Sequence, residues 1–320
     1  WKYFQYLTLL FTEIYLDWHF NDRGGFLERL NTFVVNFDSS VGKPDQVGQY
    51  TLDSLNKVAF WNATGSGKTL IMHVNILQYL HYLKKAGKEK DLNRIILLTP
   101  NEGLSQQHLD EMILSGFSAK IFEKDKTLDF YGGERPIEII DIHKLKDEGK
   151  EKTVSVEAFE GNNLVLVDEG HKGTGGAEWM DKRNRLCAEG FSFEYSATFG
   201  QAMKAAKDKE LVKQYAKCIL FDYSYKYFYE DGFGKDYNIL NLADDSDANR
   251  KKLYLTACLL TFYQQLKIYK DKFKELQPFN IEKPLMVFVG AYVSAGSNDT
   301  QEKKNMRSDI ADVLEFFANF

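Results

Sequence analysis

Residues 63–69, ATGSGKT, are the stretch whose residue types and spacing suit chemistry most plainly. A glycine-rich loop between a strand and a helix can bind phosphates through its backbone amides, and its lysine can reach the β- and γ-phosphates. The residues expected to hold a nucleotide are Thr64, Gly65, Ser66, Gly67, Lys68 and Thr69. The Thr69 hydroxyl is also expected to contact Mg²⁺. A loop that is merely flexible is the structural alternative.

Two adjacent carboxylates follow another apolar run, LVLVDEGH at 164–171. At the end of a strand, Asp168 is placed to hold Mg²⁺ through water, and Glu169 to orient and deprotonate an attacking water. A strand followed by a solvated acidic turn is the alternative, and the phosphate loop upstream favours the catalytic interpretation. The sequence therefore predicts ATP and Mg²⁺ as cofactors, with Lys68, Asp168 and Glu169 as catalytic residues.

Short apolar runs separated by helix-length segments must position these groups. The runs are residues 57–61, 94–99, 137–141, 164–167 and 191–196. Their alternation with helical patterns predicts an α/β fold with a mainly parallel sheet covered on both faces. The apolar helix expected after the phosphate loop ends in Lys84, Lys85 and Gly87, which suits a helix C-terminus.

The segments outside this pattern are expected to be mostly helical. Residues 1–36 form an aromatic, helical opening, and residues 225–231 a short helix closed by Gly232. A long helix is expected at about 248–277, a strand at 284–293, and a further helix at the end of the chain.

Composition bounds the setting of the protein. Hydrophobic residues make up 44% of the 320 residues, and the net charge of −5 neither predicts nor excludes nucleic-acid binding. The three cysteines have no metal-ligand spacing, which favours a reducing, cytoplasmic location. No segment reaches the roughly 18 apolar residues of a membrane span. We therefore expect no membrane partner.

ATGSGKT, DEGH and EYSATF (194–199), in this order, resemble motifs I, II and III of superfamily 2 helicases of the DExH group. From about residue 50 onward, the chain is most similar to the helicase subunit (Res) of type III restriction enzymes. Motif I departs from its usual pattern at Asn62, six places before Lys68, where a small residue is common. The residue pattern predicts a helical segment at 1–50. The resemblance implies a first RecA-like ATPase domain at 51–242, and a connecting helix with the beginning of a second RecA-like domain at 243–320.

The resemblance also implies roles for further residues. His171 would relay between the ATP site and motif III, where Ser196 and Thr198 supply hydroxyl groups. Residues 97–111 resemble motif Ia, so Thr99, Asn101 and Gln106 are candidates for nucleic-acid contact; helix capping, with Asn101 as the N-cap, is an equal alternative. Some such enzymes read adenine with a glutamine upstream of the loop. Gln46 and Gln49 are candidates, although both fall in an expected loop.

The implied function is an ATP-dependent DNA helicase or translocase of a restriction or phage-defence system, with a methyltransferase or other defence subunits as partners. Two alternatives stay open: an RNA helicase, and a nucleotide-dependent P-loop interaction module that moves no strand. A small-molecule kinase is more distant, because the DEGH pair suits activation of water. The sequence contains no arginine-finger motif of the second domain and no recognisable nuclease site. The chain as given is therefore expected to hydrolyse ATP weakly or not at all.

Overall fold

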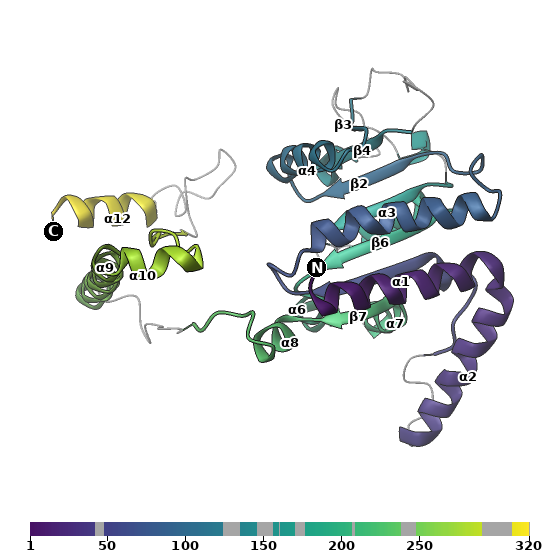
Figure 1. The fold of residues 1–320 in the computed structure, drawn as a ribbon, viewed down its shortest axis with the longest axis horizontal. Coiled ribbons are helices and arrows are strands. Elements are labelled where there is room, and N and C mark those ends of the chain that lie inside the picture. Colours follow the sequence, from purple (N-terminus) through teal and green to yellow (C-terminus); the bar gives the residue numbers. More distant parts are fainter. Residues whose placement is uncertain are drawn as a thin grey trace, which may run out of the picture. The chain divides into compact units, whose positions relative to one another are not determined.

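The computed structural model describes residues 1–41, 48–123, 135–145, 156–159, 161–169, 177–206, 209–237, 248–289 and 309–319. The chain divides into two compact units, Trp1–Lys235 and Asp236–Phe320. The described strands all belong to the first unit, and the described part of the second unit is helical or irregular (Figure 1).

A seven-stranded sheet in the order β3-β4-β2-β5-β6-β1-β7 is the centre of the first unit. All neighbouring strands are parallel. The strands are β1 (Lys57–Asn62), β2 (Ile95–Thr99), β3 (Ala119–Ile121), β4 (Ile137–Asp141), β5 (Leu164–Asp168), β6 (Phe191–Ser196) and β7 (Ile219–Tyr223). The five predicted runs form β1, β2, β4, β5 and β6, so the predicted α/β class is confirmed. The apolar pattern did not predict β3 or β7.

Helices cover both faces of this sheet, because alternate residues of each strand point to opposite sides. In β1, Val58 and Phe60 pack in one core cluster with residues of α1 (Tyr3–Asn21), α3 (Lys68–Lys85) and α4 (Glu102–Leu114). Ala59, between them, packs in another cluster with α6 (Phe199–Ala206) and α7 (Lys209–Cys218). On that second face α5 (Ala177–Leu186) packs beside β2, β4 and β5. This layered, all-parallel arrangement fits the RecA-like fold that the motif resemblance implies.

The opening segment forms two helices, α1 and α2 (Arg23–Val41). Helix α1 lies on the α3 side of the sheet (Figure 1). Its Leu16 is fully buried. Its Glu13 carboxylate accepts hydrogen bonds from Gln78 and Tyr82 of α3, both at 2.8 Å. Among the described helices, none is long and apolar enough to span a membrane.

The remaining short elements of the first unit are η1 (Asp53–Asn56), η2 (Ile142–Lys144), η3 (Val156–Phe159) and α8 (Tyr225–Glu230). As expected, α8 is followed by Gly232, whose φ of 77° is left-handed. The described elements of the second unit are α9 (Ala248–Asp271), α10 (Phe273–Leu276), η4 (Gln277–Phe279) and α12 (Asp309–Ala318).

The strand predicted at 284–293 is wrong for its described part. Residues 281–289 have no regular structure, and Leu285 and Val289 are 83% and 92% exposed. A strand needs a hydrogen-bonded neighbour, and the described part of the second unit offers none. Residues 290–293 lie outside the described ranges, and the beginning of a second RecA-like domain stays a prediction.

A buried ionic cluster joins β1, β6 and α5. The Glu194 carboxylate of β6 forms ion pairs with Arg183 of α5 and with Lys57, at 2.5 and 3.2 Å, and accepts a 2.7 Å hydrogen bond from Tyr215. Burial alone would raise the pKa of Glu194, but the charges of Arg183 and Lys57 and the Tyr215 hydrogen bond outweigh it and lower this pKa to about 2. In the folded state Glu194 is therefore an anion with a partner for each carboxylate oxygen.

We predict that Glu194→Gln lowers the free energy of unfolding by about 3–5 kcal/mol at neutral pH, because it leaves buried cations unpaired. Since folding depresses the pKa of Glu194, its contribution is complete above an unfolded pKa of roughly 4.3 and is lost as pH falls toward about 2. Denaturant unfolding across this pH range should show the difference between wild type and variant shrinking. Asp17→Asn, which breaks the exposed Asp17–Lys85 pair, should cost less than about 1 kcal/mol. A difference that stays constant with pH would contradict this account.

Candidate functional site

The predicted phosphate loop joins the end of β1 to the start of α3. Gly65 and Gly67 have φ angles of 85° and 88°, in the left-handed region that glycine adopts without strain. Lys68 is the first residue of α3, so the unpaired amides of this helix's first turn begin at the loop. The two glycines thus allow the sharp backbone turn between β1 and α3.

Buried polar atoms that have no partner among the described residues lie in this loop and at the end of β1 just before it. Asn62 and Ser66 are both 0% exposed, and neither the Asn62 amide atoms nor the Ser66 hydroxyl bonds to any described residue. Burying such groups unpaired is costly unless a ligand or water satisfies them. Together with the left-handed glycines and the open helix start, they fit a bound phosphate chain. Asn62, the position that departs from the usual motif, is thus one of the unsatisfied groups.

Lys68 lies close to the acidic pair. Its ammonium donates to the backbone carbonyl oxygen of Asn62 at 3.4 Å. Burial lowers the pKa of Lys68, while the charges of Glu169 and Asp168 oppose that shift. The loop lysine and the two carboxylates at the end of β5 therefore share one electrostatic site, although they are 100 residues apart in sequence.

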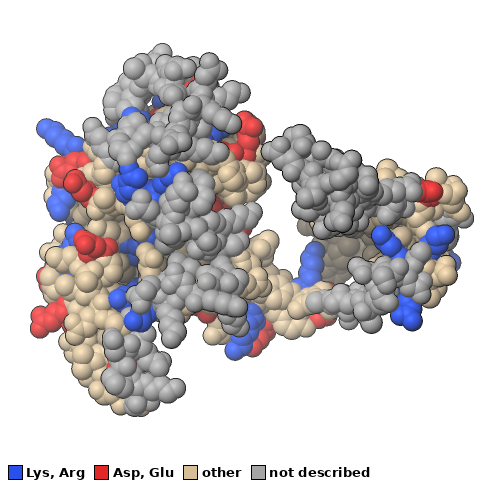
Figure 2. Space-filling model, turned by 180° about the vertical axis from the view of Figure 1, so that it is seen from behind, with Lys and Arg blue, Asp and Glu red and all other residues tan. Residues whose placement is uncertain are grey.

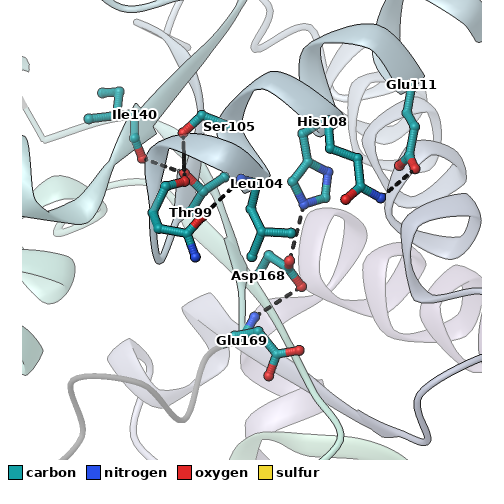
Figure 3. Close-up of polar contacts among 10 residues, drawn as sticks. Thr99, Leu104, Ser105, His108, Glu111, Ile140, Asp168 and Glu169 are labelled. Atoms are coloured by element: carbon teal, nitrogen blue, oxygen red, sulfur yellow. Dashed lines mark hydrogen bonds and ion pairs between the residues drawn. The ribbon is translucent and has the colours of Figure 1, made fainter. Parts of the chain in front are cut away.

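Asp168 ends β5, and two donors fix its carboxylate. The His108 Nε2 lies 3.1 Å from Oδ2, and the Glu169 backbone amide donates to Oδ1 at 3.0 Å (Figure 3). Burial alone would raise the pKa of Asp168, but the hydrogen bond and charge of His108, the charge of Lys68 and the Glu169 amide outweigh it and lower the pKa. Asp168 is thus held as an anion, which is the state that binds a metal ion.

Glu169 has a left-handed backbone, with φ of 54°. For a residue other than glycine this conformation costs on the order of 1–3 kcal/mol and is concentrated at functional sites. This φ turns the chain immediately after β5, so Glu169 does not continue the extended strand. His171 lies outside the described residues, so its relay role stays a prediction.

The motif III residues follow β6. Ser196 is its last residue, and its hydroxyl oxygen accepts a 3.0 Å hydrogen bond from the Thr198 backbone amide. The Thr198 hydroxyl is buried and has no partner among the described residues. Trp61 of β1 donates its indole N–H to the Ala197 carbonyl oxygen at 3.0 Å. This turn is therefore tied to the strand that carries the phosphate loop.

The motif Ia candidates lie at the end of β2 and in the first two turns of α4, with different exposure. Asn101 is exposed and caps the helix, accepting a 2.9 Å hydrogen bond from the Leu104 amide, which is the capping alternative. Gln106 is exposed and donates to Asp110 at 3.1 Å. Thr99 is 1% exposed, and its hydroxyl lies 2.6 Å from that of Ser105. Only Asn101 and Gln106 therefore face solvent, and their contact with nucleic acid stays a prediction.

The sequence did not reveal three residues that support the site: Gln5, Trp61 and His108. The Gln5 side-chain amide donates to the Ser66 carbonyl oxygen at 2.9 Å, and a Cβ at Gly67 would lie 2.6 Å from its nitrogen. No spacing rule links these residues to their targets, so the sequence offered no signal for them. Of the two glutamines predicted upstream, Gln46 lies outside the described ranges and Gln49 is exposed.

Comparison with solved structures finds likeness at low identity. The UvsW helicase from bacteriophage T4 is 17% identical over 53% of this chain and 54% of that one, with a TM-score of 0.34. The Sulfolobus solfataricus SWI2/SNF2 ATPase core, solved with dsDNA, is 12% identical over 78% of this chain and 57% of that one, at 0.37. S. cerevisiae Dbp5, bound to RNA and ADP BeF3, is 17% identical over 60% of this chain and 49% of that one, with a TM-score of 0.31. This chain spans about half the length of these proteins, and TM-scores this low assign neither substrate nor activity.

Family comparison gives the firmer result. Comparison with curated proteins finds no match. The model of the family described as "Type III restriction enzyme, res subunit" matches residues 28–201, just over half of the chain, and this range contains the phosphate loop and both carboxylates. The chain therefore belongs to the family of type III restriction enzyme res subunits, which are helicase-type ATPases.

Proposed function

We propose that the protein is an ATP-dependent nucleic-acid motor, a helicase or translocase that acts on DNA. One observation carries this proposal: the loop after β1 and Asp168 at the end of β5 lie at the same carboxyl edge of the parallel sheet, where the turn after β6 and the start of α4 also lie. Ligands of open α/β sheets bind at that edge. ATP and nucleic acid would then contact neighbouring segments of one rigid sheet.

In this proposal residues 64–69 bind the phosphates of ATP, and Lys68 offsets their charge. Thr69 and Asp168 hold Mg²⁺, which when bound would neutralise charge developing on the phosphates. Glu169 orients and deprotonates the attacking water. His171 would relay to Ser196 and Thr198 in motif III.

Nucleic acid would meet the exposed start of α4 through Asn101 and Gln106. A helix start with polar side chains suits phosphate oxygens. On the face shown in Figure 2, Lys and Arg lie in small groups between Asp and Glu. We infer that polar side chains and backbone amides at the start of α4 would contribute contacts to nucleic-acid phosphates.

The choice of DNA, and a role in a restriction or phage-defence system, rest on family membership. In such a system a methyltransferase or another defence subunit would be the partner. An RNA helicase and a nucleotide-dependent interaction module without strand movement are the outcomes that the following measurement separates from this proposal.

We predict that single- or double-stranded DNA stimulates the weak ATP hydrolysis expected of the chain as given. Lys68→Ala should reduce the stimulated rate by about 100-fold or more, because it removes a positive charge from the phosphoryl group. Lys84→Ala, at the exposed end of the same helix, is the matched control and should be neutral. Stimulation by RNA alone would indicate the RNA helicase. Nucleotide binding that responds to no polynucleotide would indicate the interaction module.

Substitutions at Asn101 can separate capping from nucleic-acid contact. Asn, Asp and Ser cap helices about equally well, so Asn101→Asp and Asn101→Ser should both preserve α4. A carboxylate facing a phosphate costs about 1 kcal/mol in water, so Asn101→Asp should weaken DNA binding about three- to tenfold. Asn101→Ser should bind DNA nearly as wild type does. If both variants have the same affinity for DNA in a fluorescence-anisotropy titration, Asn101 caps the helix and does not contact nucleic acid.

A further inference from the structure

His108 is a buried histidine in the middle of α4 that contacts the predicted metal carboxylate. The residue is 4% exposed, and Nε2 lies 3.1 Å from Asp168 Oδ2 (Figure 3). An ionised carboxylate only accepts hydrogen bonds, so the Nε2–H must donate. Nδ1 is buried and bonds to no described residue. Its contact with Asp168 is thus the one hydrogen bond of this ring among the described residues.

The contact completes a two-point hold on Asp168. The Glu169 amide occupies one carboxylate oxygen and His108 the other, which leaves each oxygen with a lone pair free for a further partner. A carboxylate ligand fixed in this way binds a metal ion without first becoming ordered. Outer residues of this kind typically change metal affinity by about 10- to 100-fold.

The helix that carries His108 is itself fixed to the sheet. The Ser105 hydroxyl, one turn before His108, lies 2.6 Å from the Thr99 hydroxyl at the end of β2. Asn101 caps the same helix at its exposed start. The first two turns of α4 therefore join an exposed surface, the end of β2 and the end of β5 through side-chain hydrogen bonds.

We propose that His108 is a positioning residue that holds Asp168 for Mg²⁺ and ties it to α4, so that nucleic acid at the start of α4 and Mg²⁺-nucleotide strengthen each other's binding. The proposal rests on the motor function proposed above, because it takes the exposed start of α4 as the nucleic-acid contact. Coupling between two sites is reciprocal, so each ligand should raise affinity for the other by the same factor.

His73 provides a matched control. It is 5% exposed, belongs to the neighbouring helix α3, and its Nδ1 lies 2.8 Å from the Ser115 hydroxyl. His73→Leu and His108→Leu each remove a buried imidazole with one hydrogen bond, but only the second removes a bond to Asp168. His108→Gln supplies an amide N–H at a reach similar to that of Nε2 and is the conservative variant.

The experiment measures the affinity of the four proteins for a fluorescent, non-hydrolysable ATP analogue. Titrations run in EDTA and at increasing Mg²⁺, with and without a single-stranded DNA or RNA oligonucleotide. In wild type we expect the oligonucleotide to raise Mg²⁺-nucleotide affinity about fivefold or more. His108→Leu should require about tenfold more Mg²⁺ and lose the oligonucleotide effect, with unchanged affinity in EDTA. His108→Gln should restore both properties, and His73→Leu should keep them.

Three results would overturn the inference: wild-type Mg²⁺ dependence and coupling in His108→Leu, equal losses in His73→Leu, or no recovery in His108→Gln. Affinity in EDTA reports an intact phosphate loop in each variant, so a folding defect is recognised directly. A wild-type protein that binds the nucleotide but neither DNA nor RNA would overturn the motor function, and the tie to α4 with it. Binding of DNA with coupling retained in His108→Leu would overturn only this inference.

Discussion

Parallel pairing of β5, β6 and β1 is the constraint on which the site depends. The register sets Asp168 beside Tyr195 and Trp61 beside Ser196, so the carboxylate, the motif III turn and the phosphate loop leave the sheet at the same edge. A slip by one residue would turn each side chain to the opposite face. The buried Glu194 cluster, which joins β6 to β1 and α5, opposes such a slip, because it would separate paired charges.

Much of the site is organised by residues that hold other groups in place. Gln5 fixes a carbonyl of the phosphate loop, Trp61 fixes a carbonyl of the motif III turn, and His108 fixes a carboxylate. Each comes from an element remote in sequence from the group it holds. Catalysis by charge stabilisation requires dipoles that are already oriented, and bonds of this kind provide that orientation.

The five strands and the change from strand to helix at 63–69 were predictable because their signals are local. The run at 137–141 matches β4 at both ends, and Lys68 begins α3 where the motif places a helix start. β3 has only three residues, too few for an apolar pattern. The predicted strand at 284–293 shows the converse, since an apolar run forms a strand only where a neighbour pairs with it. His108 was not predictable, because its contact spans 60 residues and exists only once β2 and β5 are neighbours.

Helix α1 lies before residue 28, where the family match begins, yet it belongs to the same core as the phosphate loop. Phe20 packs on Tyr79, and Gln5 reaches the loop itself. A fragment trimmed to the matched range would uncover the apolar side of α3 and free the Ser66 carbonyl, and exposed surface of this kind promotes aggregation. The family match at residues 28–201 is thus shorter than the unit that folds together, because that unit includes α1.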